Sequence, residues 1–362
     1  MQSDISNLRS RSAVHFIGGK MSTSKPQSIN HDLLQNSRWV VIVAKPVPVW
    51  GLDSRRSVHI DNSPEIVSSR IGDWLRVRSI ASTFDNDTAE AKCRTCHFLE
   101  FMIHLYVGPR DSTYIEVIRN QGCSLEYRTI RLALIAAAKG LDSSENFNRP
   151  NLKIPDDLLS TKYSALTIGD LENELDRCSD LLHSCDRNKV LFALENLAHM
   201  TNVDKVHTET AHNVSKLIMA NTVDIRDLIL AIFNSKNRKM HDLINAKICC
   251  ACLSILAHSL TSLSKKCEHF DEDFNSFIEE VIPCLIDGVE NIQCTHHASI
   301  ALRCLCTLLR TSSLACSKAN ESKTIFNAVE QAVQIGRRDS FKLETTARIT
   351  LDVLHSKLDT RV

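Results

Sequence analysis

The chain has 362 residues, 43% of them hydrophobic and 24% charged, which is ordinary for a globular protein with room for roughly two or three domains. Its 43 Lys and Arg residues balance 43 Asp and Glu residues, which excludes a global electrostatic attraction to nucleic acid or membranes. The low content of 10 glycines and 8 prolines favours long regular elements and argues against an enzyme built on glycine-rich phosphate loops.

The 14 cysteines raise the question of the compartment in which the chain works. Residues 1–20 are polar and lack the apolar segment of a secretory signal, and no apolar run approaches the ~20 residues of a membrane span. We therefore expect an intracellular protein, cytoplasmic or nuclear, that does not associate with membranes. Its thiols are expected to stay reduced and to serve as small hydrophobic side chains.

The N-terminal part of the chain divides into a leader and a small module. Residues 1–36 are rich in Ser, Asn and Gln, which predicts a disordered leader, and Met21 is an alternative start to Met1. Residues 37–122 predict a β-rich module. Its first segment, "RWVVIVAKPVPVW", contains an apolar run whose continuation is limited to a sheet edge or a bend by two prolines.

Two short strands are expected next in this module. The first is "SVHID" at 57–61, and a Gly-Asp turn at 72–73 predicts a second strand with Leu75 and Val77 on its buried face. The arrangement resembles the central part of an S1-like or OB-fold barrel, in which "VGD" turns into a "VKVKV"-type strand after an "HIS"-like strand. The residues that carry this resemblance are Val58, His59, Ile60, Ile71, Gly72, Asp73, Leu75 and Val77. It implies a small β-barrel, and an SH3-like fold gives the same pattern.

The rest of the module is predicted from polarity and apolar runs. "STFDNDTAE" at 82–90 predicts a polar loop, residues 93–107 predict a strand or a short helix, and "STYIEVIRN" at 112–120 predicts a further strand. The next segment, 123–164, predicts one helix followed by a polar linker. This helix begins near Ser124 and stops at a glycine, as helix C-termini often do.

The segment 165–362 is predicted to be α-helical, and four of its helices share one pattern. The pattern is a small residue, Leu, two variable residues, Leu, then a small or polar residue, and it begins at Ala193, Cys252, Ala301 and Thr350. Its first leucines are 59, 49 and 49 residues apart. This spacing resembles armadillo/HEAT-type repeats of about 40–47 residues, which implies helix pairs stacked around one continuous core. A helical bundle without repetition is the alternative.

The stretch "CCACLSILAHSL" at 249–260 could be a metal or redox site or the buried face of a helix. It places Cys249, Cys250, Cys252 and His258 within ten residues. On a helix, Cys249 and Cys252 share one stripe and Cys250 points away from it. Cys252, however, occupies the repeat position held elsewhere by Ala and Thr. A position that holds Ala, Thr or Cys in different helices is selected for small size. We therefore interpret the stretch as a packed helix that carries the shared pattern.

The nearest approach to a metal site is Cys93-x-x-Cys96-His97. A Cys-x-x-Cys pair supplies two of the four ligands that zinc needs, but a second pair at the usual spacing is missing. Buried thiols are the alternative interpretation. The Cys-x-His-His sequence at 294–297 suits a metal even less, because adjacent histidines on a helix point about 100° apart. We therefore predict no metal and no cofactor.

Enzyme motifs are also missing from the sequence. It contains no nucleophile elbow, no Walker loop, no G-x-G-x-x-G and no H-E-x-x-H. We therefore expect a non-enzymatic scaffold or adaptor that binds a protein partner through the surface of residues 165–362.

The alternative function is single-stranded nucleic acid binding, of RNA or ssDNA, by the N-terminal module. Small barrels hold single strands with basic residues and exposed aromatic side chains. On the predicted strand, Trp74, Arg76 and Arg78 share the face opposite the buried one. The full candidate set is Trp50, Arg55, Arg56, His59, Trp74, Arg76 and Arg78. An ordinary charged outer face with one packed tryptophan would have the same composition.

Overall fold

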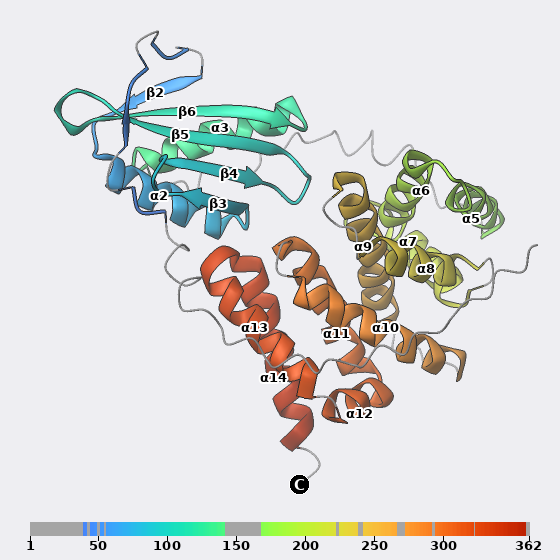
Figure 1. Ribbon diagram of the computed structural model, residues 1–362. Helices are drawn as coiled ribbons and strands as arrows, with labels where there is room; N and C mark the ends of the chain where they lie inside the picture. The colour runs from blue at the N-terminus through green and yellow to red at the C-terminus, as the bar shows by residue number, and fades with distance from the viewer. Residues whose placement is uncertain are drawn as a thin grey trace, which may run out of the picture. The chain divides into compact units, whose positions relative to one another are not determined.

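A computed structural model describes residues 39–41, 44–48, 51–53, 56–141, 168–221, 224–237, 242–265, 272–291, 294–321 and 323–359 (Figure 1). Within these residues the chain is mainly α, and a small antiparallel sheet precedes the helical region. This confirms the predicted fold class. The predicted leader and most of the predicted linker after residue 141 lie outside the described residues.

The sheet of the N-terminal module is an open antiparallel sheet in the order β2-β6-β5-β4-β3, and β1 pairs with β5 in parallel. The strands are β1 (Lys45–Pro46), β2 (Ser57–Ile60), β3 (Ala81–Asp85), β4 (Glu90–Arg94), β5 (Glu100–Val107) and β6 (Thr113–Gln121). Strands β2 and β6 confirm two of the predicted strands. Buried and less buried residues alternate along β5, as expected for a sheet with only one covered face.

The predicted loop at 82–90 was wrong, because most of this segment forms the hairpin of β3 and β4. The two strands pair from Ala81 opposite Arg94 to Asp85 opposite Glu90. The carboxylate of Asp85 accepts hydrogen bonds from the backbone N–H groups of Asp87 and Thr88, at 3.1 and 3.0 Å. Asp therefore makes the turn that joins the strands, and the polar composition reflects that turn alone.

The predicted strand over residues 71–80 was also wrong, because helix α2 (Pro64–Val77) occupies most of this segment. Pro64 lies in the first turn, where its missing N–H has no cost. The helix buries Val67, Ile71, Trp74 and Leu75, which follow helical spacing. Val77, expected in the core, is 59% exposed.

The Gly-Asp pair that suggested a barrel turn thus lies inside a helix. Of the residues behind the S1-like resemblance, Val58 to Ile60 form β2, but Ile71 to Val77 form a helix in place of the turn and strand. Among the described strands, β2 and β3 remain the two edges of an open sheet.

Helices α2 and α3 (Ser124–Ala138) cover the buried face of the sheet. Helix α3 confirms the predicted helix, and its chain reverses at Gly140 with φ of +73°, the left-handed conformation that glycine adopts easily. Ala133, Leu134 and Ala137 of α3 pack into the same core as the sheet, so this helix completes the module.

The helical region is an array whose members pack against one another around one large core. Its helices are α5 (Ile168–Leu182), α6 (Arg187–Met200), α7 (Thr208–Met219), α8 (Ile225–Asn237), α9 (Leu243–Lys265), α10 (Glu272–Glu290), α11 (Thr295–Thr311), α12 (Ser313–Glu321), α13 (Lys323–Asp339) and α14 (Phe341–Asp359).

The four helices that share the sequence pattern are α6, α9, α11 and α14, and they are successive neighbours in the array. Helix α6 packs on α9, α9 on α11, and α11 on α14, while α5, α8, α10 and α13 each pack against one of them from a second layer (Figure 1). The small residues of the pattern, Ala193, Cys252, Ala301 and Thr350, are all 0% exposed. A small side chain at this position lets neighbouring backbones approach, so the shared pattern marks helices that lie next to one another.

Helix α9 corrects the expectation that no apolar run reaches the length of a membrane span. Residues Leu243–Ser264 are long and apolar enough to cross a membrane, and 72% of their most apolar window is buried inside the protein. Here α9 packs against α6, α7, α8 and α11, so the same apolar surface is covered by protein.

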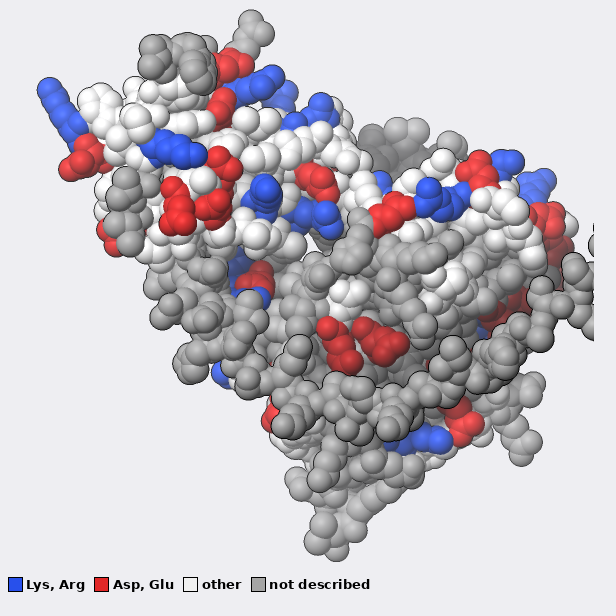
Figure 2. All heavy atoms as spheres, viewed as in Figure 1, with Lys and Arg blue, Asp and Glu red and all other residues white. Residues whose placement is uncertain are grey.

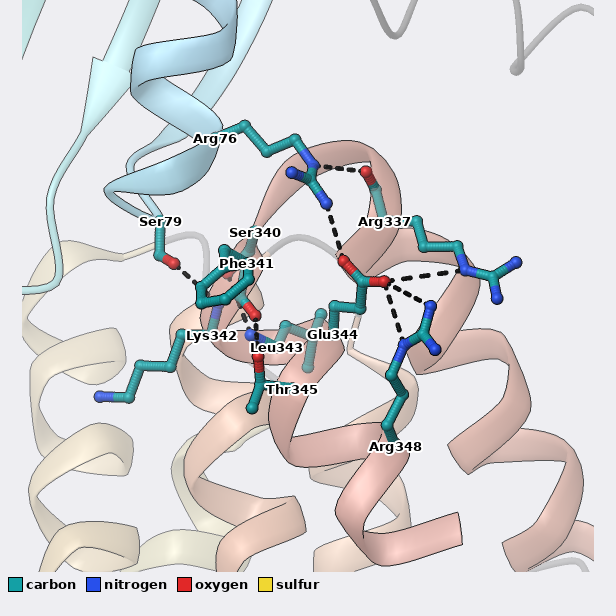
Figure 3. A network of polar contacts seen from close by, with 10 residues as sticks. All are labelled: Arg76, Ser79, Arg337, Ser340, Phe341, Lys342, Leu343, Glu344, Thr345 and Arg348. Carbon is teal, nitrogen blue, oxygen red and sulfur yellow. Dashed lines mark hydrogen bonds and ion pairs between the residues drawn. The ribbon is translucent and has the colours of Figure 1, made fainter. Parts of the chain in front are cut away.

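A polar network joins α2 to the hairpin of α13 and α14 (Figure 3). The guanidinium of Arg76 donates hydrogen bonds to the carbonyl oxygen of Arg337 and, at 2.7 Å, to the carboxylate of Glu344. The backbone N–H of Lys342 donates to Ser79 Oγ at 2.9 Å. The carboxylate of Glu344 is only 13% exposed and also accepts from Arg348.

Candidate functional site

The structure does not gather the predicted nucleic-acid residues on one face. Trp50 and Arg55 lie outside the described residues. Trp74 is 8% exposed in the core of the module, and Arg76 is held by Glu344. Arg78 is exposed beyond the last turn of α2. The predicted face of alternating Trp74, Arg76 and Arg78 was wrong, because α2 turns Arg76 to the side opposite Trp74 and ends before Arg78.

The other two candidates of this set have local partners. Arg56 forms an ion pair with Asp53 at 3.3 Å, and His59 lies 3.5 Å from Asp61 and against the ring of Tyr114. On the face of the module shown in Figure 2, basic and acidic side chains are interspersed among the described residues. No basic stripe is therefore visible on this face of the described chain.

The Cys93, Cys96 and His97 trio does not converge either. Cys93 is 5% exposed in the core of the module, where burial raises the pKa of its thiol to about 12. Cys96 and His97 are exposed in the connection between β4 and β5. Among the residues that the structure describes, no group of three or more His, Cys, Asp or Glu side chains could hold a metal ion.

A groove runs across the four repeating helices and has a volume of about 440 Å³. It is lined by the C-terminal cap of α6 and by side chains of α9, α11 and α14, including Thr261, Arg303, Thr307, Arg310 and Thr346. The groove thus follows from the stacking of equivalent helices, each of which presents its polar edge there. Sequence reasoning placed a binding surface on residues 165–362 and did not single out the residues of this groove.

The groove carries an excess of positive charge. Arg303 and Arg310 are exposed, lie two turns apart on α11, and form no ion pair with any described residue. Asp204 lines the groove as well, and Lys205 follows it in the chain. Burial, followed by the charge of Arg303, lowers the pKa of His258 to about 4, so its imidazole is neutral at pH 7 and adds no charge to the groove.

The hydroxyl groups of the groove are oriented by their own helices. The hydroxyls of Thr261, Thr307 and Thr346 donate to the carbonyl oxygens four residues earlier, at 2.6, 3.0 and 2.8 Å. A hydroxyl that has donated its proton in this way retains lone pairs for accepting. These oxygens can therefore accept hydrogen bonds from the backbone N–H groups of a bound peptide.

The cysteines of α9 separate into two groups. Cys249 and Cys252 are 0% exposed in the core of the array, which agrees with the packing interpretation. Cys250 lies in a different, small cluster with Phe98 of the module and Cys294 at the start of α11. The sequence placed Cys250 off the helical stripe and could not show this neighbour, which is 44 residues away.

A second and larger cleft, about 750 Å³, lies between the module, the start of α11 and the end of α13. Its lining includes Arg94, Cys96, Phe98, Cys294 and His296. Burial, together with the charge of Lys342, lowers the pKa of His296 to about 4, so this imidazole is neutral at pH 7.

The chain was also compared with known proteins. No protein-family model, curated protein or solved structure matches it. Function is therefore argued from the groove and the cleft themselves.

Proposed function

We propose that the chain is a non-enzymatic scaffold or adaptor that binds an extended acidic segment of a partner protein in the groove across α6, α9, α11 and α14. The observation that carries this proposal is that one groove is built from four equivalent, stacked helices. Armadillo/HEAT-type arrays, which the sequence pattern resembles, use extended surfaces of this kind for binding.

Charge complementarity selects an acidic partner. Arg303 and Arg310 offer two guanidinium groups without carboxylate partners in the described chain, and guanidinium groups bind carboxylates through paired hydrogen bonds. The rim adds an apolar contact, because Ile349 is 42% exposed beside them. The occupant therefore combines carboxylates with at least one apolar side chain.

The spacing of the two arginines suggests the conformation of the bound segment. Seven residues of helix α11 separate them by roughly 10 Å along its axis. In a polyproline II conformation, every third side chain points the same way, and these side chains are about 9 Å apart. A segment with acidic residues at every third position matches both arginines, and the three threonine oxygens can accept its backbone N–H groups.

The direct test is a titration of the full chain with two fluorescent peptides of the same composition. One peptide carries glutamates at every third position, and the other carries them in one block. We expect the first to bind at least about tenfold more tightly, a difference of ~1.4 kcal/mol, and to weaken with added salt. Equal affinities would contradict the spacing argument.

Matched variants locate the binding site. The double variant Arg303→Glu, Arg310→Glu should lose binding of the spaced peptide, whereas the double variant Lys139→Glu, Lys189→Glu should not. Lys139 and Lys189 are exposed cations that do not line the groove, so their reversal changes the net charge by the same amount. A similar loss in both variants, or tighter binding of a single-stranded RNA of matched length, would argue against a protein-binding groove.

A further inference from the structure

We propose that Cys294 is a peroxide-reactive cysteine and that Cys250 is its resolving partner, so that oxidation links α9 to the start of α11 by a disulfide. Neither residue lines the groove of the proposed function. The proposal rests on the contact between the two thiols and on the cleft that opens onto one of them.

The two thiols are held together by packing. Cys250 is 6% exposed and lies in a cluster with Phe98 and Ala246, and Cys294 packs against this cluster. The two thiols are close enough that each is the largest influence on the pKa of the other. The sulfur atoms are thus neighbours although 44 residues separate them in the chain.

Only one of the two sulfurs is open to an oxidant. Cys294 is half-buried and lines the cleft of about 750 Å³, whereas Cys250 lies behind it. Hydrogen peroxide is small enough to enter such a cleft. The geometry therefore assigns the first reaction to Cys294 and the second to Cys250.

The surroundings of Cys294 favour its thiolate, which is the reactive form. The hydrogen bond with Cys250 outweighs burial, and together with backbone N–H groups at the start of α11 and the charge of Arg94 it lowers the pKa of the Cys294 thiol to about 7. The same hydrogen bond and burial raise the pKa of Cys250 well above its usual value. Cys250 therefore keeps its proton until the second step.

The chemistry balances with hydrogen peroxide as the oxidant. The thiolate of Cys294 attacks one peroxide oxygen, the O–O bond breaks, and the leaving hydroxide takes a proton from solvent to form water, which leaves a sulfenic acid. The sulfur of Cys250 then attacks the sulfur of Cys294, the S–O bond breaks, and the hydroxide leaves as water with the Cys250 proton. Two thiols lose two electrons in total, and one peroxide becomes two waters.

A competing thiol must be distinguished in the test. Burial would raise the pKa of Cys96, but the hydrogen bond and charge of His97, with the charge of Lys342, outweigh it and lower this pKa. Cys96 also lines the cleft. It has no second thiol hydrogen-bonded to it among the described residues, so we expect no disulfide from it.

The experiment treats the full-length chain with hydrogen peroxide, blocks remaining thiols with N-ethylmaleimide in acid, and maps the peptides by mass spectrometry. We expect a Cys250–Cys294 disulfide that thiol reductants reverse. In Cys250→Ser the sulfenic acid at Cys294 should persist and be captured by dimedone, and Cys185→Ser, which changes an exposed cysteine elsewhere, should behave as the unmodified chain.

One arm requires no variant, so a folding defect cannot obscure the result. In the unmodified chain, N-ethylmaleimide at neutral pH should label Cys294 at least about tenfold faster than Cys304, whose burial raises its pKa to about 12. Equal labelling rates, or oxidation confined to Cys96 with Cys294 still a thiol, would overturn the proposal.

Discussion

Replacing His297 by leucine should stabilise the protein and remove part of its sensitivity to acid. His297 is 0% exposed in α11, and neither ring nitrogen has a hydrogen-bond partner among the described residues. Its ring lies 5.7 Å from that of Phe233, in an apolar setting that leucine can share. A buried polar group left without partners costs about 1–3 kcal/mol, so His297→Leu should gain roughly 1–2 kcal/mol after imperfect repacking.

The pH dependence follows from the same burial. Burial, followed by the nearby His296, lowers the pKa of His297 from 6.5 to about 3 in the native state. The unfolded state therefore takes up a proton between these values while the native state does not, and the free energy of unfolding falls as pH drops below 6.5. Between pH 7 and pH 5 this single group should remove about 2 kcal/mol, a loss that His297→Leu cannot show.

The assay is chemical denaturation followed by far-UV circular dichroism at the two pH values, with both proteins measured in the same buffers. The variant should be more stable at pH 7 by roughly 1–2 kcal/mol, and its advantage should grow by about 2 kcal/mol at pH 5. A variant less stable than the parent at pH 7, or an advantage that does not change with pH, would refute the reasoning.

Three further substitutions test the packing of the array and its contact with α2. Gly336→Ala should destabilise by about 2 kcal/mol or more in a urea titration, because its Cβ would lie 2.6 Å from the Cα of Glu344. Gly169→Ala, whose Cβ would have nothing within 4 Å, should not destabilise. Glu344→Gln removes the charge that pairs with Arg76 and Arg348 and should lower the free energy of unfolding by roughly 1–2 kcal/mol, a modest loss because solvent screens the partly exposed arginines. An unchanged thermal unfolding midpoint would show that the network contributes nothing to stability. Cys252→Ala should change the free energy of unfolding by less than about 1.5 kcal/mol. Cys252→Leu should lower it further, because the larger side chain overpacks a fully buried position, and equal effects would contradict selection for size.

The repeat register was the part of the fold that the sequence predicted well. An α-helix has 3.6 residues per turn, so leucines three residues apart predict its buried face. A small residue that recurs beside them predicts close contact between helices. The leucines that close the pattern, Leu197, Leu256, Leu305 and Leu354, are all buried. Equivalent local patterns therefore sufficed to identify equivalent helices.

The module was predicted less well because its segments are short. Residues 74–78 are too few to distinguish the hydrophobic pattern of a helix from that of a strand. The helical period becomes clear only when the buried residues Val67 and Ile71, earlier in the chain, are included. The 82–90 hairpin was missed because its strands are short. The polar residues of the turn around Asp85 dominate the composition of the segment, which therefore resembles a loop.

The two candidate sites depend on contacts that no local pattern contains. The groove arises where the edges of four helices meet, so Arg303 and Arg310 look like ordinary surface cations in the sequence. The pairing of Cys250 with Cys294 requires α9 and α11 to be placed side by side. The sequence did place Cys250 off the packed stripe, and this was the one available signal.

The proposed binding of an acidic segment by the charges of Arg303 and Arg310 can be measured in a charge-swap cycle. Four pairs are titrated: the unmodified chain and the Arg303→Glu, Arg310→Glu variant, each with the spaced glutamate peptide and with the same peptide carrying lysines. We expect both matched pairs to bind with affinities within about threefold of each other, and both crossed pairs to bind at least about tenfold more weakly. If the lysine peptide gains nothing from the reversed charges, or the glutamate peptide loses nothing, the groove is not the binding surface.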